Sequence, residues 1–309
     1  MGIVDRLMNR LTPNQNGLLF VVTSNCQTHG IASSLNLMVP NSKSIPIWTL
    51  SGLQYIIQEI NSKVDGNFVW LTTLSVEQQE EVVRKLKYKP VIAVQIPEIF
   101  FDAFHPDMTY VQLNDGTLLE SALGHYHSKI SLWCYLNNVS LDDTLKFFSG
   151  ETYIRLGYLG RHKNSLLGLK SAIANCELDT SPFGDVINHA DSFMHTFNHP
   201  KLSILAAVAE SVCVKMQITP AIRHSEIPQV LRDVLYEAGP IFPIYPEIAD
   251  FYGLEGTYLS RRQDGRILSL DEFNEESFLI YADVPFDQFN RESLFTEFFD
   301  KQMLEMMKI

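Results

Sequence analysis

Short runs of β-branched and apolar residues alternate with helical patterns over the first hundred residues, and this alternation limits the possible folds more than any other feature. Runs typical of buried strands lie at residues 17–22, 44–48, 68–72 and 90–96. Helical patterns lie between them at residues 27–37, 52–61 and 76–86. We therefore expect an α/β fold, with a parallel sheet in the N-terminal half and helices on both of its faces.

From residue 118 onward the pattern becomes largely helical. Helices are predicted at residues 118–136, 140–148, 164–177 and 202–216, and the segment from Ser181 to Gly184 is predicted to break helical structure. These patterns indicate an α/β core over residues 1–117, which carries the turn at Cys26. A mainly helical part over residues 118–309 should complete the site and cover the cleft, within one continuous structural unit.

The composition restricts the possible partners. With 46% hydrophobic and 19% charged residues, the chain is typical of a globular protein. Its formal net charge of -12 does not provide the basic surface that nucleic acid needs. No window reaches the roughly 18 apolar residues of a membrane span, and no signal peptide is evident, so we expect a cytoplasmic protein. The amphipathic segments 1–10 and 298–309 should pack on the chain's own core, although either could dock on a partner or a membrane surface.

The four cysteines form no CxxC pair, which argues against a zinc site and a disulfide framework. One of them, Cys26, lies where an apolar strand ends and a helix begins, within the segment VVTSNCQTHG. Unpaired N–H groups and the helix dipole there would lower the pKa of the thiol and could hold an oxyanion or a phosphate. Alternatively, Cys26 packs under the sheet while Ser24 or Asn25 caps the helix.

Histidines in two further segments could act as general bases. His105 follows the fourth strand, where the neighbouring Asp107 could fix its tautomer, although a simple capped turn is an alternative. His195 and His199 come late in the chain, as the partner of an early nucleophile does in hydrolases. Their spacing of four would also suit a metal on a helix, but Pro200 should break that helix, so no metal is expected.

A short basic segment, Arg161, His162 and Lys163, precedes the helix expected at residues 164–177. It could hold a phosphate group, for example the 3′-phosphate of coenzyme A, or it could be a solvated turn. His125 and His127 fall inside the helix expected at residues 118–136, where residues two apart face different sides, so they should not share a metal.

Three segments in this order, SNCQTHG, FHPDMTY and FMHTFNHP, resemble the WcbI family of capsular-polysaccharide biosynthesis proteins. The resemblance covers about residues 17–215. It implies an α/β core with helical additions, binding of coenzyme A, and acetyl transfer to a sugar. It also implies a site similar to that of SGNH and GDSL hydrolases, with cysteine in place of serine.

The resemblance implies roles for individual residues. Cys26 would be the nucleophile, and an amide of Gln27 would help to define the oxyanion pocket. His105 and His199 would be the candidate bases, with His195 as a further candidate. Apart from the resemblance, Ser24, Asn25 and Gln27 at the turn are predicted to contact coenzyme A, together with Arg161, His162 and Lys163. The family implies no matching position for Arg161 or Lys163, which rest on the residues alone.

The sequence thus favours acetyl transfer from acetyl-coenzyme A to a sugar hydroxyl, either through an acetyl-Cys26 thioester or directly. One alternative is a carbohydrate esterase that uses the same residues with water as the acceptor. Another is a non-catalytic scaffold that associates peripherally with a polysaccharide assembly through its amphipathic ends.

Overall fold

The computed structural model of the chain describes residues 17–188 and 191–308, so the expected amphipathic segment 1–10 lies outside the described residues. The chain divides into two compact units. Unit 1 contains the described residues of Met1–Phe100, Leu167–His189 and His199–Glu237. Unit 2 contains those of Phe101–Leu166, Ala190–Asn198 and Ala238–Ile309. Residues 118–309 therefore contribute to both units.

Unit 1 is built on a four-stranded parallel sheet in the order β2-β1-β3-β4. Its strands are β1 (Leu19–Ser24), β2 (Lys43–Trp48), β3 (Phe68–Thr72) and β4 (Pro90–Gln95). The helices between them are α2 (Thr28–Met38), α3 (Gly52–Lys63) and α4 (Val76–Lys85), with the 3-10 turn η1 (Thr49–Ser51) before α3. The α/β prediction is confirmed, and each of these elements lies within a few residues of its expected place.

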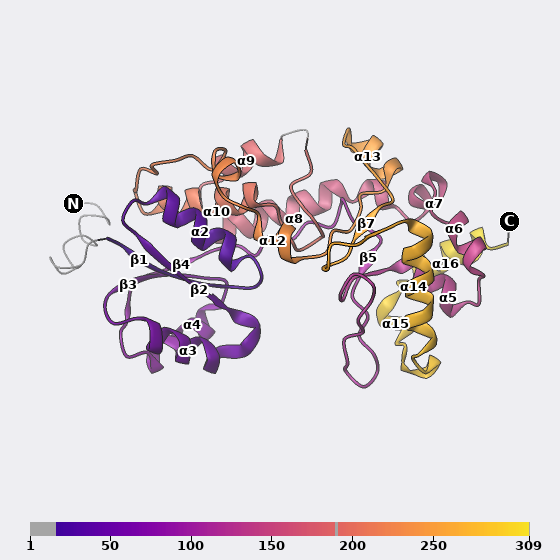
Figure 1. Cartoon of the computed structure of the whole chain (residues 1–309), viewed down its shortest axis with the longest axis horizontal. Helices are drawn as coiled ribbons and strands as arrows, with labels where there is room; N and C mark the ends of the chain where they lie inside the picture. The colour runs from indigo at the N-terminus through magenta and orange to yellow at the C-terminus, as the bar shows by residue number, and fades with distance from the viewer. Residues whose placement is uncertain (1–16, 189–190, 309) are drawn as a thin grey trace. The chain divides into compact units, whose positions relative to one another are not determined.

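Helices cover both faces of the sheet (Figure 1). α3 and α4 lie on one face, and α2 lies on the other beside α10 (Leu202–Lys215). Isoleucines of α3 and alternate residues of β2 share one buried cluster with Trp70 and Phe68 of β3. On the opposite face, a Cβ added at Gly30 of α2 would lie 2.4 Å from Cδ1 of Leu205. Glycine at this position therefore lets α2 and α10 approach closely.

The rest of unit 1 consists of short helices and of most of α8 (His162–Asn175), whose first residues belong to unit 2. The short helices are α9 (Ser181–Ile187), α11 (Ile227–Val230) and α12 (Val234–Ala238). The prediction that Ser181–Gly184 breaks helical structure was wrong. Pro182 lies in the first turn of α9, where its missing N–H costs no intrahelical hydrogen bond, so this segment begins a helix.

Unit 2 is mainly helical, with short strand pairs. Its helices are α5 (Lys129–Leu136), α6 (Leu141–Lys146), α7 (Gly150–Arg155), α13 (Pro246–Tyr252), α14 (Leu270–Ala282), α15 (Arg291–Leu294) and α16 (Glu297–Met306), with 3-10 turns η2 (Tyr158–Gly160) and η3 (Phe286–Gln288). Its strands are β5 (Met108–Thr109), β6 (His127–Ser128), β7 (Ser260–Arg261) and β8 (Ile267–Leu268).

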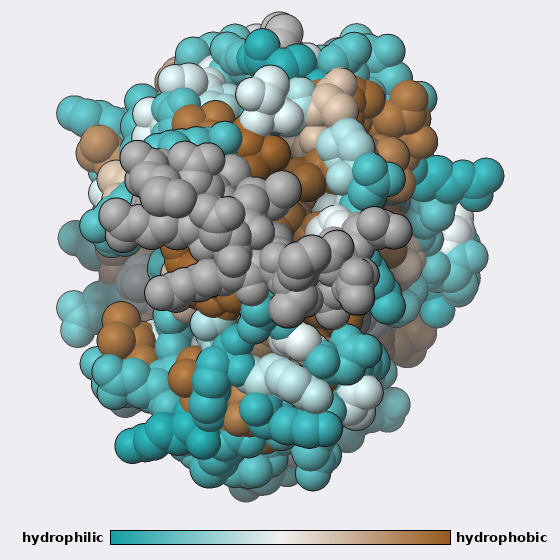
Figure 2. Space-filling view, turned by 90° about the vertical axis from the view of Figure 1, so that its left-hand side faces the viewer, coloured by the Kyte–Doolittle hydropathy of each residue, from teal (hydrophilic) through white to brown (hydrophobic). Residues whose placement is uncertain are grey.

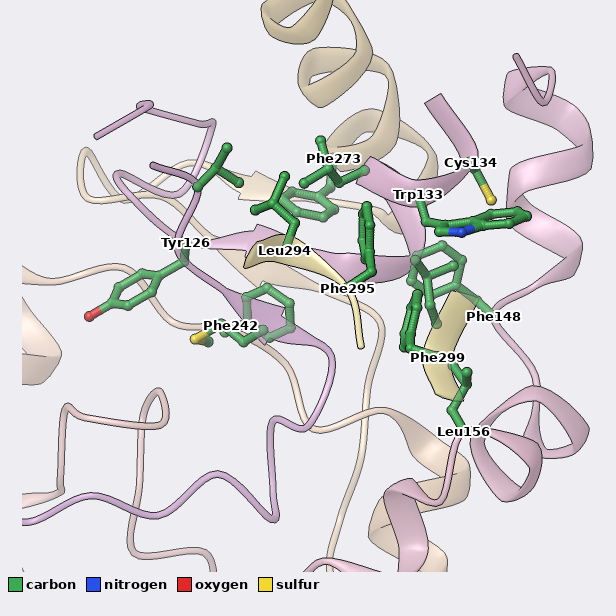
Figure 3. Packing of buried hydrophobic residues seen from close by; sticks show 14 of the residues in the cluster. Tyr126, Trp133, Cys134, Phe148, Leu156, Phe242, Phe273, Leu294, Phe295 and Phe299 are labelled. Atoms are coloured by element: carbon green, nitrogen blue, oxygen red, sulfur yellow. The ribbon is translucent and has the colours of Figure 1, made fainter. Parts of the chain in front are cut away.

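Aromatic side chains fill the core of unit 2 (Figure 3). Phe295 and Phe299 stack with their ring centroids 5.5 Å apart, and Trp133 donates its indole N–H to Asp300 of α16 at 2.7 Å. Phe299 and Met303 of α16 are buried. The C-terminal amphipathic segment therefore packs on the chain's own core, as expected for its described residues.

The helix expected at residues 118–136 was wrong over residues 118–128, because only α5 (Lys129–Leu136) is helical. Gly124 has a φ of 69°, which a right-handed helix excludes, and Ser128 caps α5 by accepting the N–H of Ser131. His127 lies in β6, and its ring nitrogens are 3.0 Å from the Tyr281 hydroxyl and 3.1 Å from the carbonyl oxygen of Leu119. His127 is therefore a bonded core residue.

The face of the molecule in Figure 2 is mostly hydrophilic, with hydrophobic side chains in several separate groups. This distribution is normal for the surface of a globular protein. Among the described residues, no helix is both long and apolar enough to cross a bilayer.

Candidate active site

The turn that carries Cys26 is held by the side chain and the backbone of Asn25. Asn25 Oδ1 accepts the backbone N–H of Gln27 at 3.0 Å, and the Asn25 carbonyl accepts the N–H of Thr28 at 3.2 Å. Gln27 is the N-cap residue of α2 and makes no side-chain capping bond. The polar cluster after β1 therefore forms a tight turn into α2, in which Asn25 satisfies N–H groups at the start of the helix.

Gln27 ties this turn to the segment that follows β4. Its Nε2 donates to the carbonyl of Ile99 at 2.8 Å, and its Oε1 accepts the N–H of Ile99 at 3.0 Å. Both residues are buried. These bonds engage the side-chain amide of Gln27, and Asn25 engages its backbone N–H.

Cys26 is partly exposed, whereas Cys134, Cys176 and Cys213 are buried, and all four are free thiols. The Cys26 thiol lies 3.8 Å from Asn25 Oδ1. Burial, with a smaller contribution from the negative charge of Glu98, raises the pKa of Cys26 to about 11. The expectation of a lowered pKa was therefore wrong, because the cost of desolvating a thiolate exceeds the stabilisation that the nearby N–H groups provide.

Two further residues of unit 1 shape this turn. Ser24, the last residue of β1, is fully buried, and its hydroxyl has no hydrogen-bond partner among the described residues. Glu98 accepts a short hydrogen bond from Asn25 Nδ2. Glu98 was not among the predicted site residues, although its place just after β4 puts it at the carboxyl edge of the sheet, where ligands of such folds bind.

His199 belongs to unit 1 and is partly buried, just before α10. The described part of the segment between α9 and α10 is not helical, so His195 and His199 do not lie on one helical face. No group of His, Cys, Asp and Glu in the described residues could hold a metal ion.

His105 and His195 are buried and belong to unit 2, where both meet Phe242. The His105 ring lies edge-on to Phe242 at 6.1 Å between ring centroids, and the His195 carbonyl accepts the Phe242 N–H at 3.2 Å. Asp107 is fully buried, and its carboxylate accepts the hydroxyl groups of Tyr158 at 3.1 Å and Tyr245 at 2.8 Å. Asp107 thus stabilises the polar part of the unit 2 core.

Asp107 also accepts the N–H of Ile130 at 3.0 Å, and burial raises its pKa despite these bonds. A carboxylate held by several donors is tolerated in a core because each bond offsets part of the desolvation cost. Asp107 was expected to fix the tautomer of His105. In the structure its carboxylate joins the first turn of α5 to Tyr158 and Tyr245.

The basic segment lies against the turn that follows His105. Arg161 pairs with Asp102 at 3.1 Å and donates to the Pro106 carbonyl at 3.3 Å, and Lys129 donates to the same carbonyl at 2.9 Å. Burial and the neighbouring Arg161 lower the pKa of Lys129 to about 8. Lys129 was not predicted as a site residue, because it fell inside the helix expected at residues 118–136, where no local pattern indicated this contact.

The other two residues of the basic segment differ in exposure. His162 is partly buried and packs against Tyr252 and Phe101, with ring centroids 5.1 and 5.5 Å apart, and burial lowers its pKa. Lys163 is exposed in the first turn of α8. Lys163 is therefore the member of this segment best placed to meet a ligand.

The family model described as the polysaccharide biosynthesis enzyme WcbI matches residues 19–221. The chain belongs to the WcbI family. The matched range includes Cys26, the basic segment and the candidate bases His105, His195 and His199, and it confirms the family predicted from the sequence. A search of curated protein sequences found no match to the chain.

A solved structure described as WcbI, a novel polysaccharide biosynthesis enzyme, has the same fold. It matches with a TM-score of 0.62 and 15% identity, covering 94% of this chain and 96% of the other. Its description specifies a native form without a disulfide bond between coenzyme A and a cysteine. Because the match extends over nearly the whole chain, the C-terminal part beyond residue 221 shares the WcbI fold as well.

Proposed function

We propose that this chain transfers an acetyl group from acetyl-coenzyme A to a sugar hydroxyl during synthesis of a capsular or surface polysaccharide. The observation that carries the proposal is the position of Cys26, a partly exposed thiol at the carboxyl end of β1, while the other three thiols are buried. The description of the solved WcbI structure supports it, because it specifies a form without a disulfide bond between coenzyme A and a cysteine and so relates these two groups.

In the first step the Cys26 sulfur attacks the acetyl carbon, and a new C–S bond forms as the bond to coenzyme A breaks. Because the pKa of Cys26 is raised to about 11, the thiol is protonated near neutral pH and needs a base as it attacks. We propose His199 of unit 1 for this role, with His105 and His195 as the alternatives. The proton passes from the base to the departing coenzyme A thiolate.

In the second step a sugar hydroxyl attacks the acetyl-Cys26 thioester. The histidine accepts the hydroxyl proton and the ester bond forms as the bond between the acetyl carbon and the Cys26 sulfur breaks. The histidine then passes this proton to the Cys26 sulfur, which regenerates the thiol. Burial that disfavours the thiolate does not disfavour a neutral thioester, so the acetylated and protonated forms of Cys26 both suit this turn. In a direct transfer from coenzyme A to sugar, Cys26 would only shape the pocket.

The remaining predicted residues would bind coenzyme A. We propose that Ser24 and Asn25 of unit 1 contact its thiol end at the turn. For unit 2, taken by itself, we propose Arg161, His162 and Lys163 as a segment that binds a phosphate such as the 3′-phosphate of coenzyme A. A cation and the first N–H groups of α8 both favour a phosphate.

A transfer assay with labelled acetyl-coenzyme A and carbohydrate acceptors tests the proposal. The wild type should label carbohydrate, and Cys26→Ala should lose at least about a hundredfold in rate while coenzyme A still raises its melting temperature. Cys176→Ala, which removes a buried thiol, should transfer as the wild type does. Full activity of Cys26→Ala would exclude the thioester route, and hydrolysis of acetylated sugars without coenzyme A would indicate an esterase.

A further inference from the structure

Trp48 is an exposed tryptophan beside the Cys26 turn. The chain has three tryptophans, of which Trp70 and Trp133 are fully buried, whereas 43% of the Trp48 side chain is exposed. A large aromatic side chain left in solvent forfeits the free energy that its burial would contribute.

The register of the sheet fixes where Trp48 lies. It is the last residue of β2 and pairs with Ser24, the last residue of β1, so it is one strand spacing from the residue that begins the Cys26 turn. Ile45 and Ile47 of β2 join the core on the α3 side, so Trp48, one position further, points to the face covered by α2. Its ring meets the His29 ring of α2 at 6.5 Å, nearly perpendicular.

Trp48 and His29 thus form a ledge with an aromatic face and polar edges. His29 is exposed, and Trp48 makes no hydrogen bond through its indole N–H within the described residues. The next residues, in η1, include Leu50, which is 76% exposed. This ledge offers an apolar surface, one N–H donor and an imidazole that can donate or accept.

We propose that the Trp48–His29 ledge binds a pyranose ring of the acceptor carbohydrate. One face of a pyranose consists of C–H groups, which an indole face can cover, while the ring carries hydroxyls at its rim that reach nitrogen donors and acceptors. The ledge would hold such a ring next to the turn where its hydroxyl must attack. The inference deepens the proposed function and rests on it, because it names the place of the second substrate.

Adenine of coenzyme A is the competing occupant, because bases also stack on aromatic rings. The reacting thioester lies at one end of coenzyme A, and the pantetheine arm separates it from the adenine. A ring that is one strand spacing from the Cys26 turn is therefore at the reacting end of the cofactor. This position fits the acceptor and not the nucleotide.

Acrylamide quenching of tryptophan fluorescence tests the ledge without any assay of transfer. Because Trp70 and Trp133 are buried, the quenchable emission should come from Trp48, and Trp48→Phe should abolish it. We expect methyl pyranosides of glucose, galactose, mannose and N-acetylglucosamine, at high millimolar concentration, to reduce the quenching, with at least one effective. Failure of all of them, or protection by adenosine 3′,5′-bisphosphate instead, would overturn the proposal.

Kinetic measurements distinguish a failure of the ledge proposal from a failure of the proposed acetyl transfer. Trp48→Ala should raise the KM for the acceptor about tenfold with a smaller change in kcat. Trp48→Phe keeps an aromatic ring, so its KM should stay close to that of the wild type. Phe286→Ala, which removes an exposed aromatic ring of unit 2, should change neither. Acetylation of Cys26 by acetyl-coenzyme A should be unaffected by Trp48→Ala. Saccharide protection without any acetyl transfer would refute the proposed function alone, and transfer unaffected by Trp48→Ala would refute the ledge alone.

Discussion

Cys26 shows how two local effects compete at one residue. The turn places the thiol at the start of α2, where N–H groups and the dipole favour a thiolate, and the sequence alone indicates that effect. Packing around the turn removes water from the sulfur, and Glu98 adds a negative charge. Burial depends on residues distant in the sequence, so the direction of the pKa shift could not be predicted from the motif.

The raised pKa predicts slow alkylation of Cys26. Below a pKa of about 11 the thiolate fraction rises about tenfold per pH unit, so the rate with iodoacetamide should climb through pH 7–10 without a plateau. The rate can be followed by mass spectrometry of the peptide that contains Cys26. A plateau reached by pH 8 would contradict this account of the thiol.

Replacing Glu98 separates its charge from the effect of burial. Glu98→Gln keeps an oxygen that can accept from Asn25 but removes the negative charge, so the pKa of Cys26 should fall and alkylation at a fixed pH should become faster. Glu80→Gln, the same change at an exposed position of α4, provides the control.

Among the elements, those with a strong local signal were predicted and those fixed by distant contacts were not. The run predicted as a strand at residues 17–22 forms the strand Leu19–Ser24 in the structure, because β-branched residues and burial act together there. The expected helix at residues 118–136 failed where Gly124 takes a positive φ. Gln27 and Ile99 are 72 residues apart, so no local pattern could have indicated the bonds that join them.

Helix α8 carries a prediction at the scale of one element. If its first turn binds the 3′-phosphate, Lys163→Ala should weaken binding of coenzyme A about threefold to tenfold and leave dephospho-coenzyme A unchanged. Isothermal titration calorimetry would measure the affinities for coenzyme A and for dephospho-coenzyme A. Low salt is needed because added salt screens the charge and should reduce the difference between wild type and variant. Lys170→Ala, also exposed on α8, should alter neither affinity, and an equal loss for both ligands with Lys163→Ala would exclude a phosphate contact.

At the scale of the whole molecule, the sequence predicted the family and the fold class, including a largely helical C-terminal part, but not which residues form the core of that part. Beyond residue 221 the family model does not match, yet the fold of the solved WcbI structure covers 94% of the chain. The core of unit 2 joins aromatic residues from many segments, such as Tyr153 and Tyr245, which stack at 5.3 Å. Such a core has no period in the sequence, so its residues could be assigned only from the structure.

The central claim is that the acetyl group passes through Cys26, and the most direct measurement is mass spectrometry of the protein after brief exposure to acetyl-coenzyme A without acceptor. The account predicts one added acetyl group, located on the peptide that contains Cys26, retained by Cys176→Ala and absent from Cys26→Ala. The label should disappear when an acceptor carbohydrate is added. A protein that transfers acetyl groups at the wild-type rate while Cys26 never carries one would contradict the claim.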